Sequence, residues 1–320
     1  MNSAVGTAAK VKRAASTTAF QDAVISGLSR RQKAIPPRFL YDSRGSELFE
    51  QITTIPEYYP TRTEIGLLKA RGREIRQLVG ECHSVVEFGS GSSTKTPLIL
   101  EGLAPSIYVP IDISETCLFK SAAAVAARYP DIEVMPVAGD FMQPLRAPQR
   151  AFVGRTLGFF PGSTLGNFDH SEAVDLLRAF AATLGSDSVL LIGIDLLKNP
   201  RCIEVAYDDA AGVTAAFNLN LIDRINRELG GNIKSTSFEH QAIWNDQHHR
   251  IEMHLVAKED MEFSAAERQF SMRCGESIHT ENSYKYSLEE IRLMARVSGW
   301  EPQRIWVDEN HLFSLSLWKR

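Results

Sequence analysis

The sequence predicts an α/β fold, in which a mostly parallel β-sheet carries helices on both faces and is accompanied by a second α+β lobe. From about residue 84, apolar strand-like segments alternate with helix-like segments, which is the pattern of a parallel sheet. Near the C-terminus, two β-rich segments are separated only by Asp308-Glu309-Asn310. A connection this short suits a hairpin, so the last strand is expected to run antiparallel to its neighbours.

Each element of this sheet is marked by a run of apolar or helix-forming residues. Strands are predicted over residues 84–88, 107–113, 132–138, 156–160 and 188–194, followed by a terminal hairpin of residues 304–307 and 311–318. Helices are predicted over residues 94–103, 118–128 and 173–184. Short apolar runs bounded by turn residues are consistent with strands that are covered on both faces.

Two stretches do not follow this alternation. Residues 198–285 contain a long helical pattern over 211–229 and then a β-rich region, in which residues 237–240 and 250–256 are expected to be neighbouring strands. Together with the N-terminal stretch, this region is expected to form the second lobe. The predicted division is a sheet domain of residues 61–197 and 286–320, a lobe of residues 20–60 and 198–285, and a disordered tail of residues 1–19.

Composition excludes several classes of protein. The 320 residues are 44% apolar and 23% charged, with a net charge of −4, so the basic excess of a nucleic-acid binder is missing. No apolar run approaches the ~20 residues that span a bilayer. The four cysteines are scattered, and the adjacent His248 and His249 would point to opposite faces of a strand, so no metal site is expected. We expect a cytoplasmic, monomeric protein without nucleic-acid, membrane or metal partners.

A glycine-rich segment, Glu87-Phe88-Gly89-Ser90-Gly91-Ser92-Ser93, lies where the first predicted strand turns into the first helix. Glycines let the backbone approach a ligand closely, and a helix N-terminus offers N–H groups for binding. A dinucleotide-binding turn has a third glycine three residues after the second, where this chain has Thr94. The acid before the first glycine and the missing third glycine favour S-adenosylmethionine (SAM) over NAD.

Four further residues are candidates for contacts with this cofactor. Asp112 lies 23 positions after Gly89, a spacing at which an acid accepts hydrogen bonds from ribose hydroxyls, although it also suits a helix cap. Asp140 and Phe141 follow the third strand, where a carboxylate can bind the adenine amino group and a ring can pack on the base; a turn aspartate is the alternative. Lys95 can reach the methionine carboxylate, unless it is a surface lysine.

Several longer motifs occur in a fixed order and are more specific. Together they resemble the histidine Nα-methyltransferases of ergothioneine biosynthesis, and the resemblance runs from about Pro37 to the C-terminus. The motifs are Tyr58-Tyr59-Pro60-Thr61-Arg62, Glu87-Phe88-Gly89-Ser90-Gly91 with Lys95-Thr96, Gly139-Asp140-Phe141, Gly162-Ser163-Thr164-Leu165-Gly166-Asn167-Phe168, and Ala206-Tyr207-Asp208-Asp209-Ala210-Ala211-Gly212-Val213-Thr214.

The resemblance implies trimethylation of free L-histidine to hercynine by a class I SAM-dependent methyltransferase domain, with a second domain built from the N-terminal segment and a central insertion. It places the SAM contacts on Gly89, Lys95, Asp112, Asp140 and Phe141. It places the substrate contacts on Tyr58, Asn167, Tyr207, Glu281, Asn282 and Ser283, and the pocket lining on Phe49, Phe217 and Met253.

These residue types suit the chemistry of methyl transfer. The reaction needs an unprotonated amine held on the axis of the S–CH3 bond, and Tyr58 is the candidate catalytic residue because it can orient that amine. The faces of Tyr58 and Phe217 attract a methylated ammonium. Asn167 and Tyr207 can both donate to the substrate carboxylate. Glu281 can accept from an imidazole N–H while Ser283 pairs with the other nitrogen, which rejects side chains that cannot donate.

Other interpretations of the same residues remain open. Tyr58 and Tyr207 can be packing residues, Asn167 can cap a helix near Ser171, and Glu281 can lie on a solvated loop. The chain has Asn282 where the family often has an aliphatic residue, and Tyr284 where it has a smaller one. These departures motivate an alternative acceptor, either another amino acid or an amine. Two further hypotheses are an NAD-binding oxidoreductase and a SAM-binding protein without catalysis.

Overall fold

The computed structural model describes residues 18–142 and 148–320, which divide into two compact units. The first, here called the sheet unit, comprises residues 49–206, 244–251 and 282–320. The second, here called the lobe unit, comprises the described residues up to Leu48 together with 207–243 and 252–281. Of the tail expected over residues 1–19, only the last two are described, and they belong to a helix over 18–28.

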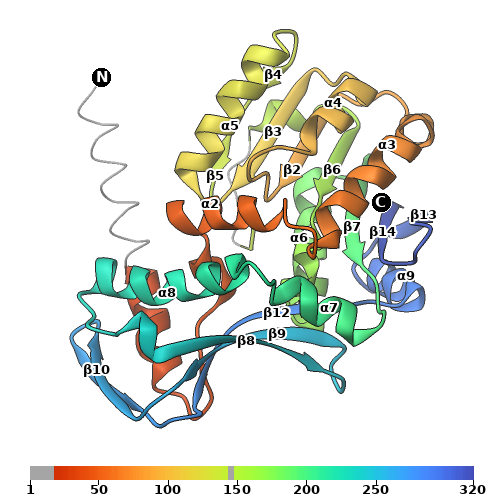
Figure 1. Cartoon of the computed structure of the whole chain (residues 1–320). Helices are drawn as coiled ribbons and strands as arrows, with labels where there is room; N and C mark the ends of the chain where they lie inside the picture. The colour runs from red at the N-terminus through yellow and green to blue at the C-terminus, as the bar shows by residue number, and fades with distance from the viewer. Residues whose placement is uncertain (1–17, 143–147) are drawn as a thin grey trace, which may run out of the picture. The chain divides into compact units, whose positions relative to one another are not determined.

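The sheet unit contains a large mixed sheet with the strand order β13-β14-β7-β6-β2-β3-β4, in which β5 also pairs with β3 (Figure 1). The strands β7, β6, β2, β3, β4 and β5 run parallel to their neighbours among this set. Strand β14 runs antiparallel to both β7 and β13. The strands are β2 (Ser84–Phe88), β3 (Ile107–Asp112), β4 (Glu133–Val134), β5 (Val137–Ala138), β6 (Thr156–Phe160), β7 (Ser188–Asp195), β13 (Glu301–Val307) and β14 (Phe313–Lys319). The predicted parallel sheet and its antiparallel last strand are confirmed.

One predicted strand is divided in two. The apolar run over residues 132–138 forms β4 and β5, which pair with different parts of β3. Met135 still donates its N–H to the carbonyl of Tyr108 (2.8 Å). Pro136 follows and has no N–H to donate, so the ladder is interrupted at that residue.

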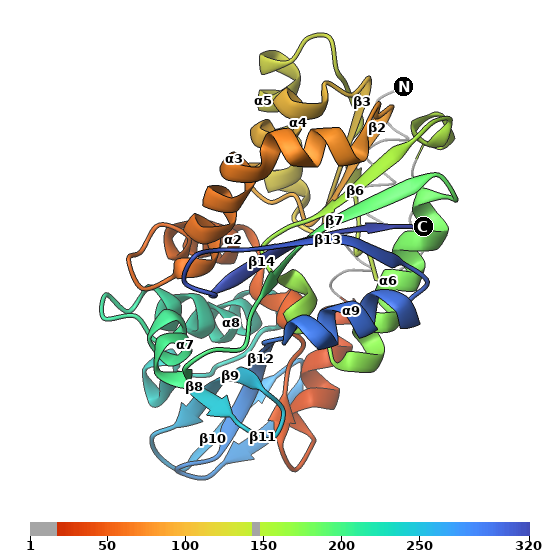
Figure 2. The same cartoon turned by 90° about the vertical axis from the view of Figure 1, so that its right-hand side faces the viewer.

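Helices cover both faces of this sheet, as Figure 2 shows. On one face lie α3 (Tyr59–Val79), α4 (Thr96–Leu103) and α5 (Glu115–Arg128), which share a core with Val85, Leu157 and Leu191. On the other face lie α6 (His170–Leu184) and α9 (Leu288–Val297). Complete burial of a large apolar side chain contributes about 2–3 kcal/mol, so these two layers account for much of the stability of the sheet unit.

Capping residues set where two of the helices begin. Asp169 caps α6 and forms a capping box with Glu172. Ser287 and Glu290 form the same arrangement at the start of α9. The alternative in which Asn167 caps the helix near Ser171 is therefore wrong, because Asp169 performs that role.

The lobe unit is built around a four-stranded sheet of order β1-β12-β9-β8 (Figure 1). The expected neighbouring strands near residues 238 and 250 are confirmed as β8 and β9. The elements are η1 (Pro37–Leu40), α8 (Val213–Leu229), β1 (Lys33–Ala34), β8 (Phe238–Asn245), β9 (Arg250–Ala257), β10 (Met261–Ala265), β11 (Arg268–Met272) and β12 (Ser277–Tyr284). Strands β8, β9 and β12 continue beyond the lobe unit into residues counted with the sheet unit.

The unit boundaries differ from those expected from the sequence. Residues 49–60, which include the end of α2 (Ser43–Ile52), are counted with the sheet unit because they lead directly into α3, which packs on the large sheet. Most of α7 (Pro200–Tyr207), which follows β7, is also counted there. None of the described helices is long and apolar enough to cross a bilayer.

Candidate functional site

The glycine-rich turn between β2 and α4 lies at the carboxyl end of the large sheet. Gly89 and Gly91 have φ angles of 73° and 50°, conformations that favour glycine. The N–H of Gly89 donates to the carbonyl of Ile111 near the end of β3 (2.8 Å). A Cβ atom on Gly89 would lie 3.6 Å from the ring of Phe141. The turn therefore brings two predicted cofactor residues, Gly89 and Phe141, close together.

Asp112 holds this turn from the end of the neighbouring strand. Its carboxylate accepts hydrogen bonds from the N–H groups of Gly91 and Ser114, both at 2.8 Å. Burial raises the pKa of Asp112, although these hydrogen bonds act in the opposite direction. A carboxylate oxygen has a second lone pair, which a ribose hydroxyl can use. The bond to Ser114 also fits the helix-cap alternative, so the ribose contact stays a prediction.

Asp140 and Phe141 follow β5, the short strand that pairs with the end of β3. Asp140 accepts a hydrogen bond from the N–H of Met142 (2.9 Å), as a turn aspartate does. The ring of Phe141 packs against Phe160 and Phe180, with centroid separations of 5.6 and 6.1 Å. These contacts fix an aromatic surface beside the glycine turn, which suits a purine base. The contact between Asp140 and the adenine amino group stays a prediction.

A hydroxyl group in the turn supports the fit of SAM. The Oγ atom of Ser90 is buried, and among the described residues it has no hydrogen-bond partner. Buried polar atoms are nearly always paired, so such a hydroxyl is suited to a polar ligand seated on the turn. The donors and acceptors of this region fit a ligand that carries a carboxylate, an amine and ribose hydroxyls, as SAM does.

Lys95 forms an ion pair that the sequence did not indicate. Its Nζ lies 2.5 Å from Oε2 of Glu64, a fully buried residue of α3. The same carboxylate accepts from the N–H of Gly162 (2.9 Å), in the loop after β6. A Cβ atom on Gly193 of β7 would lie 2.0 Å from Oε1 of Glu64, so the carboxylate needs a glycine there. Lys95 is thus held at the turn by Glu64, and its contact with the methionine carboxylate stays a prediction.

Glu87, in the strand that leads to the turn, is a buried acid. Its Oε2 accepts hydrogen bonds from the hydroxyls of Tyr108 (2.6 Å) and Thr96 (2.7 Å). Burial raises the pKa of Glu87 from 4.5 to about 7, even though both hydrogen bonds lower it. This carboxyl group points into the core, so its role is to connect β2, β3 and α4.

Two of the predicted substrate residues contact each other in the sheet unit. Tyr58 immediately precedes α3 and is 7% exposed. Its ring meets the ring of Phe49 edge-on, with centroids 6.3 Å apart at an angle of 79°. This packing orients the Tyr58 ring, as the packing interpretation expected, and is compatible with a hydroxyl that orients an amine.

The predicted residues Asn167 and Ser283 belong to segments that pack directly against each other. Asn167 ends the short helix η3 (Thr164–Asn167). A Cβ atom on the preceding Gly166 would lie 2.8 Å from the carbonyl oxygen of Tyr284 and 3.3 Å from the Oγ of Ser283. Glycine at this position therefore allows the loop after β6 to lie against the end of β12.

Ser283 is part of a buried charged network. Nζ of Lys285 donates to the Oγ of Ser283 (2.7 Å) and lies 2.8 Å from Oδ2 of Asp195 at the end of β7. Nζ of Lys198 lies 2.5 Å from Oδ1 of Asp195 and donates to the hydroxyl of Tyr59 (2.7 Å). The Tyr59 hydroxyl in turn donates to Asp195 (2.8 Å). All of these groups are almost completely buried.

The network keeps Asp195 ionised. Burial by itself raises the pKa of this carboxyl group, but the ammonium groups of Lys285 and Lys198 outweigh it and hold the pKa below its ordinary value. Burial lowers the pKa of Lys198, and repulsion by Lys285 adds to that effect. Two buried cations thus share one buried anion, so the loss of Asp195 would leave both without their counter-ion.

In the lobe unit, Tyr207 is anchored through its backbone. Nε2 of His240 donates to the carbonyl of Tyr207 (2.8 Å), while Nδ1 of the same ring accepts from the amide of Asn218 (2.9 Å). Asn218 also donates to the carbonyl of His254 (3.2 Å). Burial lowers the pKa of His240, which keeps the ring neutral and able to accept from Asn218.

The remaining predicted substrate residues lie on three elements. Phe217 of α8 is 2% exposed, and the ring of Tyr41 meets it edge-on at 5.4 Å. Met253 of β9 and Glu281 of β12 are buried, which excludes the solvated-loop alternative for Glu281. The Oδ1 atom of Asn282 is buried and lacks a hydrogen-bond partner among the described residues.

The predicted site residues are therefore distributed over both units. The cofactor residues, Phe49, Tyr58, Asn167, Asn282 and Ser283 belong to the sheet unit, whereas Tyr207, Phe217, Met253 and Glu281 belong to the lobe unit. Glu64, Lys285 and His240 were not among the residues predicted for the site. Glu64 follows the Tyr-Tyr-Pro-Thr-Arg motif by two residues, and Lys285 follows Ser283 by two residues, just beyond the end of β12.

A parallel sheet of this order, with an antiparallel final strand and a glycine turn after its first parallel strand, defines a class I SAM-dependent methyltransferase. The family model described as "Histidine-specific methyltransferase, SAM-dependent" matches residues 20–320. The chain belongs to this family.

Individual relatives agree with this assignment. The chain is 40% identical over 301 residues to a histidine N-alpha-methyltransferase of Mycolicibacterium smegmatis, a match that covers 92% of each chain. It is 38% identical over 300 residues to the protein of that name in Mycobacterium tuberculosis, again covering 92% of each. It is 28% identical over 292 residues to ergothioneine biosynthesis protein 1 of Neurospora crassa, covering 87% of this chain and 32% of that protein.

Proposed function

We propose that the chain transfers methyl groups from SAM to the α-amino nitrogen of L-histidine, up to the trimethylated betaine hercynine, as a step of ergothioneine biosynthesis. Membership of the histidine-specific family supports the reaction type. The observation that carries the choice of substrate is the hydrogen bond from Lys285 to Ser283.

Lys285 determines how Ser283 can take part in recognition. An ammonium group donates hydrogen bonds and cannot accept them, so the hydroxyl hydrogen of Ser283 has to be directed to a partner other than Lys285. A neutral imidazole carries one N–H and one nitrogen lone pair. Ser283 then donates to the lone pair, while the carboxylate of Glu281 accepts from the N–H. This pair of contacts distinguishes histidine from amino acids whose side chains lack one of the two functions.

The other contacts orient the reacting amine. The chemistry that SAM supplies when bound is an electrophilic methyl group, and Gly89, Asp112, Asp140 and Phe141 are the residues that would hold the cofactor. The hydroxyl of Tyr58 orients the unprotonated amine, and the donors on Asn167 and Tyr207 bind the substrate carboxylate. The ring faces of Tyr58 and Phe217 favour the methylated ammonium over water.

Of the two departures from the family pattern, Tyr284 is compatible with histidine as the acceptor, whereas Asn282 offers an argument for another amino acid. The hydroxyl of Tyr284 accepts from Arg250 (2.5 Å), and its ring meets His170 edge-on at 5.0 Å. Tyr284 is thus engaged with the core of the sheet unit. The buried Oδ1 of Asn282 is the one observation that favours a different amino acid.

Calorimetry tests the proposal directly. The purified chain is titrated with L-histidine and with L-tryptophan, in both cases with S-adenosylhomocysteine present. We expect saturable binding of histidine alone, and mono-, di- and trimethylated histidine when SAM replaces S-adenosylhomocysteine. Binding of neither amino acid by protein that still binds S-adenosylhomocysteine would retain the methyltransferase class and reject histidine as the acceptor.

A further inference from the structure

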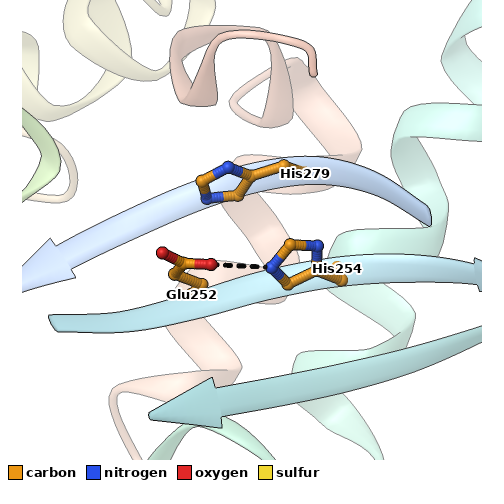
Figure 3. Close-up of side chains that lie close together, drawn as sticks. All are labelled: Glu252, His254 and His279. Atoms are coloured by element: carbon orange, nitrogen blue, oxygen red, sulfur yellow. Dashed lines mark hydrogen bonds and ion pairs between the residues drawn. The ribbon is translucent and has the colours of Figure 1, made fainter. Parts of the chain in front are cut away.

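A cluster of three potential metal ligands lies on the sheet of the lobe unit. Glu252 and His254 are two residues apart on β9, so they project from the same face, and His279 lies on the adjacent β12 (Figure 3). One ligand atom from each of the three side chains lies within 4.8 Å of the others. Two imidazoles and one carboxylate form a donor set that zinc and related divalent ions use in proteins.

The distances within the cluster suit a shared ion. Nε2 of His254 lies 3.0 Å from Oε2 of Glu252. Two ligands bound to one ion at about 2.0–2.1 Å lie roughly 3 Å apart when they occupy neighbouring positions. The ring of His279 stacks on the ring of His254, with centroids 4.7 Å apart at an angle of 15°, so the two imidazoles lie side by side at the cluster.

Each imidazole is also held by an outer hydrogen bond. Nδ1 of His254 lies 3.1 Å from the Oγ of Ser277, and Nε2 of His279 lies 3.1 Å from the carbonyl oxygen of Glu281. A carbonyl oxygen only accepts, so Nε2 of His279 carries the hydrogen in this contact, and in the neutral form of the ring Nδ1 is the nitrogen that can bind an ion. Metal-binding histidines are generally fixed in this way, with one nitrogen held by an outer partner and the other directed at the ion.

The cluster is accessible enough for an ion to enter. The side chains of His254 and Glu252 are 10% and 13% exposed. A divalent ion bound there could complete its coordination with water. It would also link β9 to β12, the two strands that carry Met253 and Glu281.

We propose that Glu252, His254 and His279 bind one divalent transition-metal ion of the zinc class. The expectation from the sequence was that the chain has no metal site, because the four cysteines are scattered and the adjacent His248 and His249 would point to opposite faces of a strand. The cluster became recognisable once β9 and β12 were seen to be neighbours. The ion has a structural role: it fixes the spacing of two strands in the lobe unit.

The test uses the full chain without an affinity tag, stripped with a chelator and dialysed. Cobalt(II) chloride is titrated in while visible absorption is followed, and zinc chloride is then added as a competitor. We expect one cobalt ion per chain, displacement by zinc, and a higher midpoint of thermal unfolding with one equivalent of zinc. Absence of saturable cobalt binding by the native chain would overturn the proposal without any variant.

Matched variants locate the site. H254Q/H279Q is expected to weaken cobalt binding by at least about tenfold. H248Q/H249Q removes the same number of imidazoles from the turn after β8 and is expected to bind like the native chain. Circular dichroism verifies folding, and Glu252→Gln decides the question if the double variant does not fold. Unchanged cobalt binding in H254Q/H279Q contradicts the proposal. If that variant does not fold, unchanged cobalt binding in Glu252→Gln contradicts it instead. Loss of cobalt binding in H248Q/H249Q also contradicts it.

Discussion

Lys285 donates a hydrogen bond to the side chain of Ser283, with Nζ and Oγ 2.7 Å apart, and both residues are buried. Both residues lie at the end of β12 or just after it, and Lys285 is simultaneously paired with Asp195 from β7. The charged network thus connects the core of the methyltransferase sheet to the proposed imidazole contact. Under the proposed function, substrate specificity and stability both depend on this lysine.

Ser283→Ala is expected to weaken histidine binding. The substitution removes the hydroxyl that donates to the imidazole nitrogen, at a cost of about 1–3 kcal/mol, which corresponds to a roughly 5- to 150-fold higher Kd. Binding of S-adenosylhomocysteine should not change. Calorimetry measures both, and Ser271→Ala, at an exposed position on β11, is the matched control. Equal histidine affinity in both variants would show that Ser283 does not contact the substrate.

Asp195→Asn is expected to destabilise the chain strongly. The substitution leaves the ammonium groups of Lys285 and Lys198 buried without their shared counter-ion, a change that costs about 3–5 kcal/mol. Asp187→Asn removes the same charge from an exposed ion pair with Arg155 and should cost less than about 1 kcal/mol. Urea denaturation monitored by circular dichroism compares the two. Similar losses in both variants would contradict the importance of the buried network.

Glu87 makes the stability of the chain depend on pH. Its pKa is about 7 in the folded chain against 4.5 ordinarily, so the folded state binds the proton more tightly. The contribution of this proton to the free energy of unfolding is complete below pH 4.5 and is lost as the pH rises through 7. The shift corresponds to about 3 kcal/mol. The glutamine of Glu87→Gln does not titrate, so this variant keeps its stability where the native chain loses it. We therefore expect the free energy of unfolding of the variant, minus that of the native chain, to be larger at pH 8 than at pH 5, as measured by urea denaturation. A difference that does not vary with pH would contradict the shifted pKa.

Gly166→Ala is expected to impair histidine turnover. The new Cβ would lie 2.8 Å from the backbone oxygen of Tyr284, which forces η3 away from the end of β12 and displaces Asn167. We expect a KM for histidine at least about tenfold higher, corresponding to about 1.4 kcal/mol. Gly72→Ala, in α3 with no atom within 4 Å of the new Cβ, should leave KM unchanged and stabilise the helix by up to about 1 kcal/mol. Steady-state kinetics would contradict the expectation if both variants behaved alike.

Local patterns were sufficient to predict the sheet. The strands from Ser84, Thr156 and Ser188 are continuous apolar runs, and a three-residue connection made the antiparallel final strand predictable. The division of residues 132–138 depended on the missing N–H of Pro136, a detail that periodicity does not register. The unit boundaries depended on where α3 packs, which is a tertiary property.

The grouping of the candidate site residues was predictable only where the order of the strands determines it. Gly89, Asp112 and Phe141 follow neighbouring strands, so topology brings them together at one edge. The partners of Lys285 and Lys95 were not predictable in this way, because Asp195 and Glu64 are distant from them in the sequence. A lysine within a β-rich segment is ordinarily exposed, whereas Lys285 is buried by its pairing with Asp195.

Mass spectrometry of the reaction products tests the central claim most directly. The purified chain is incubated with SAM and L-histidine, and in parallel with SAM and each of the other amino acids. The proposed function predicts histidine that carries one, two and finally three methyl groups on its α-amino nitrogen, with no comparable product from the other amino acids. Methylation of a different amino acid, with histidine left unmodified, would contradict it.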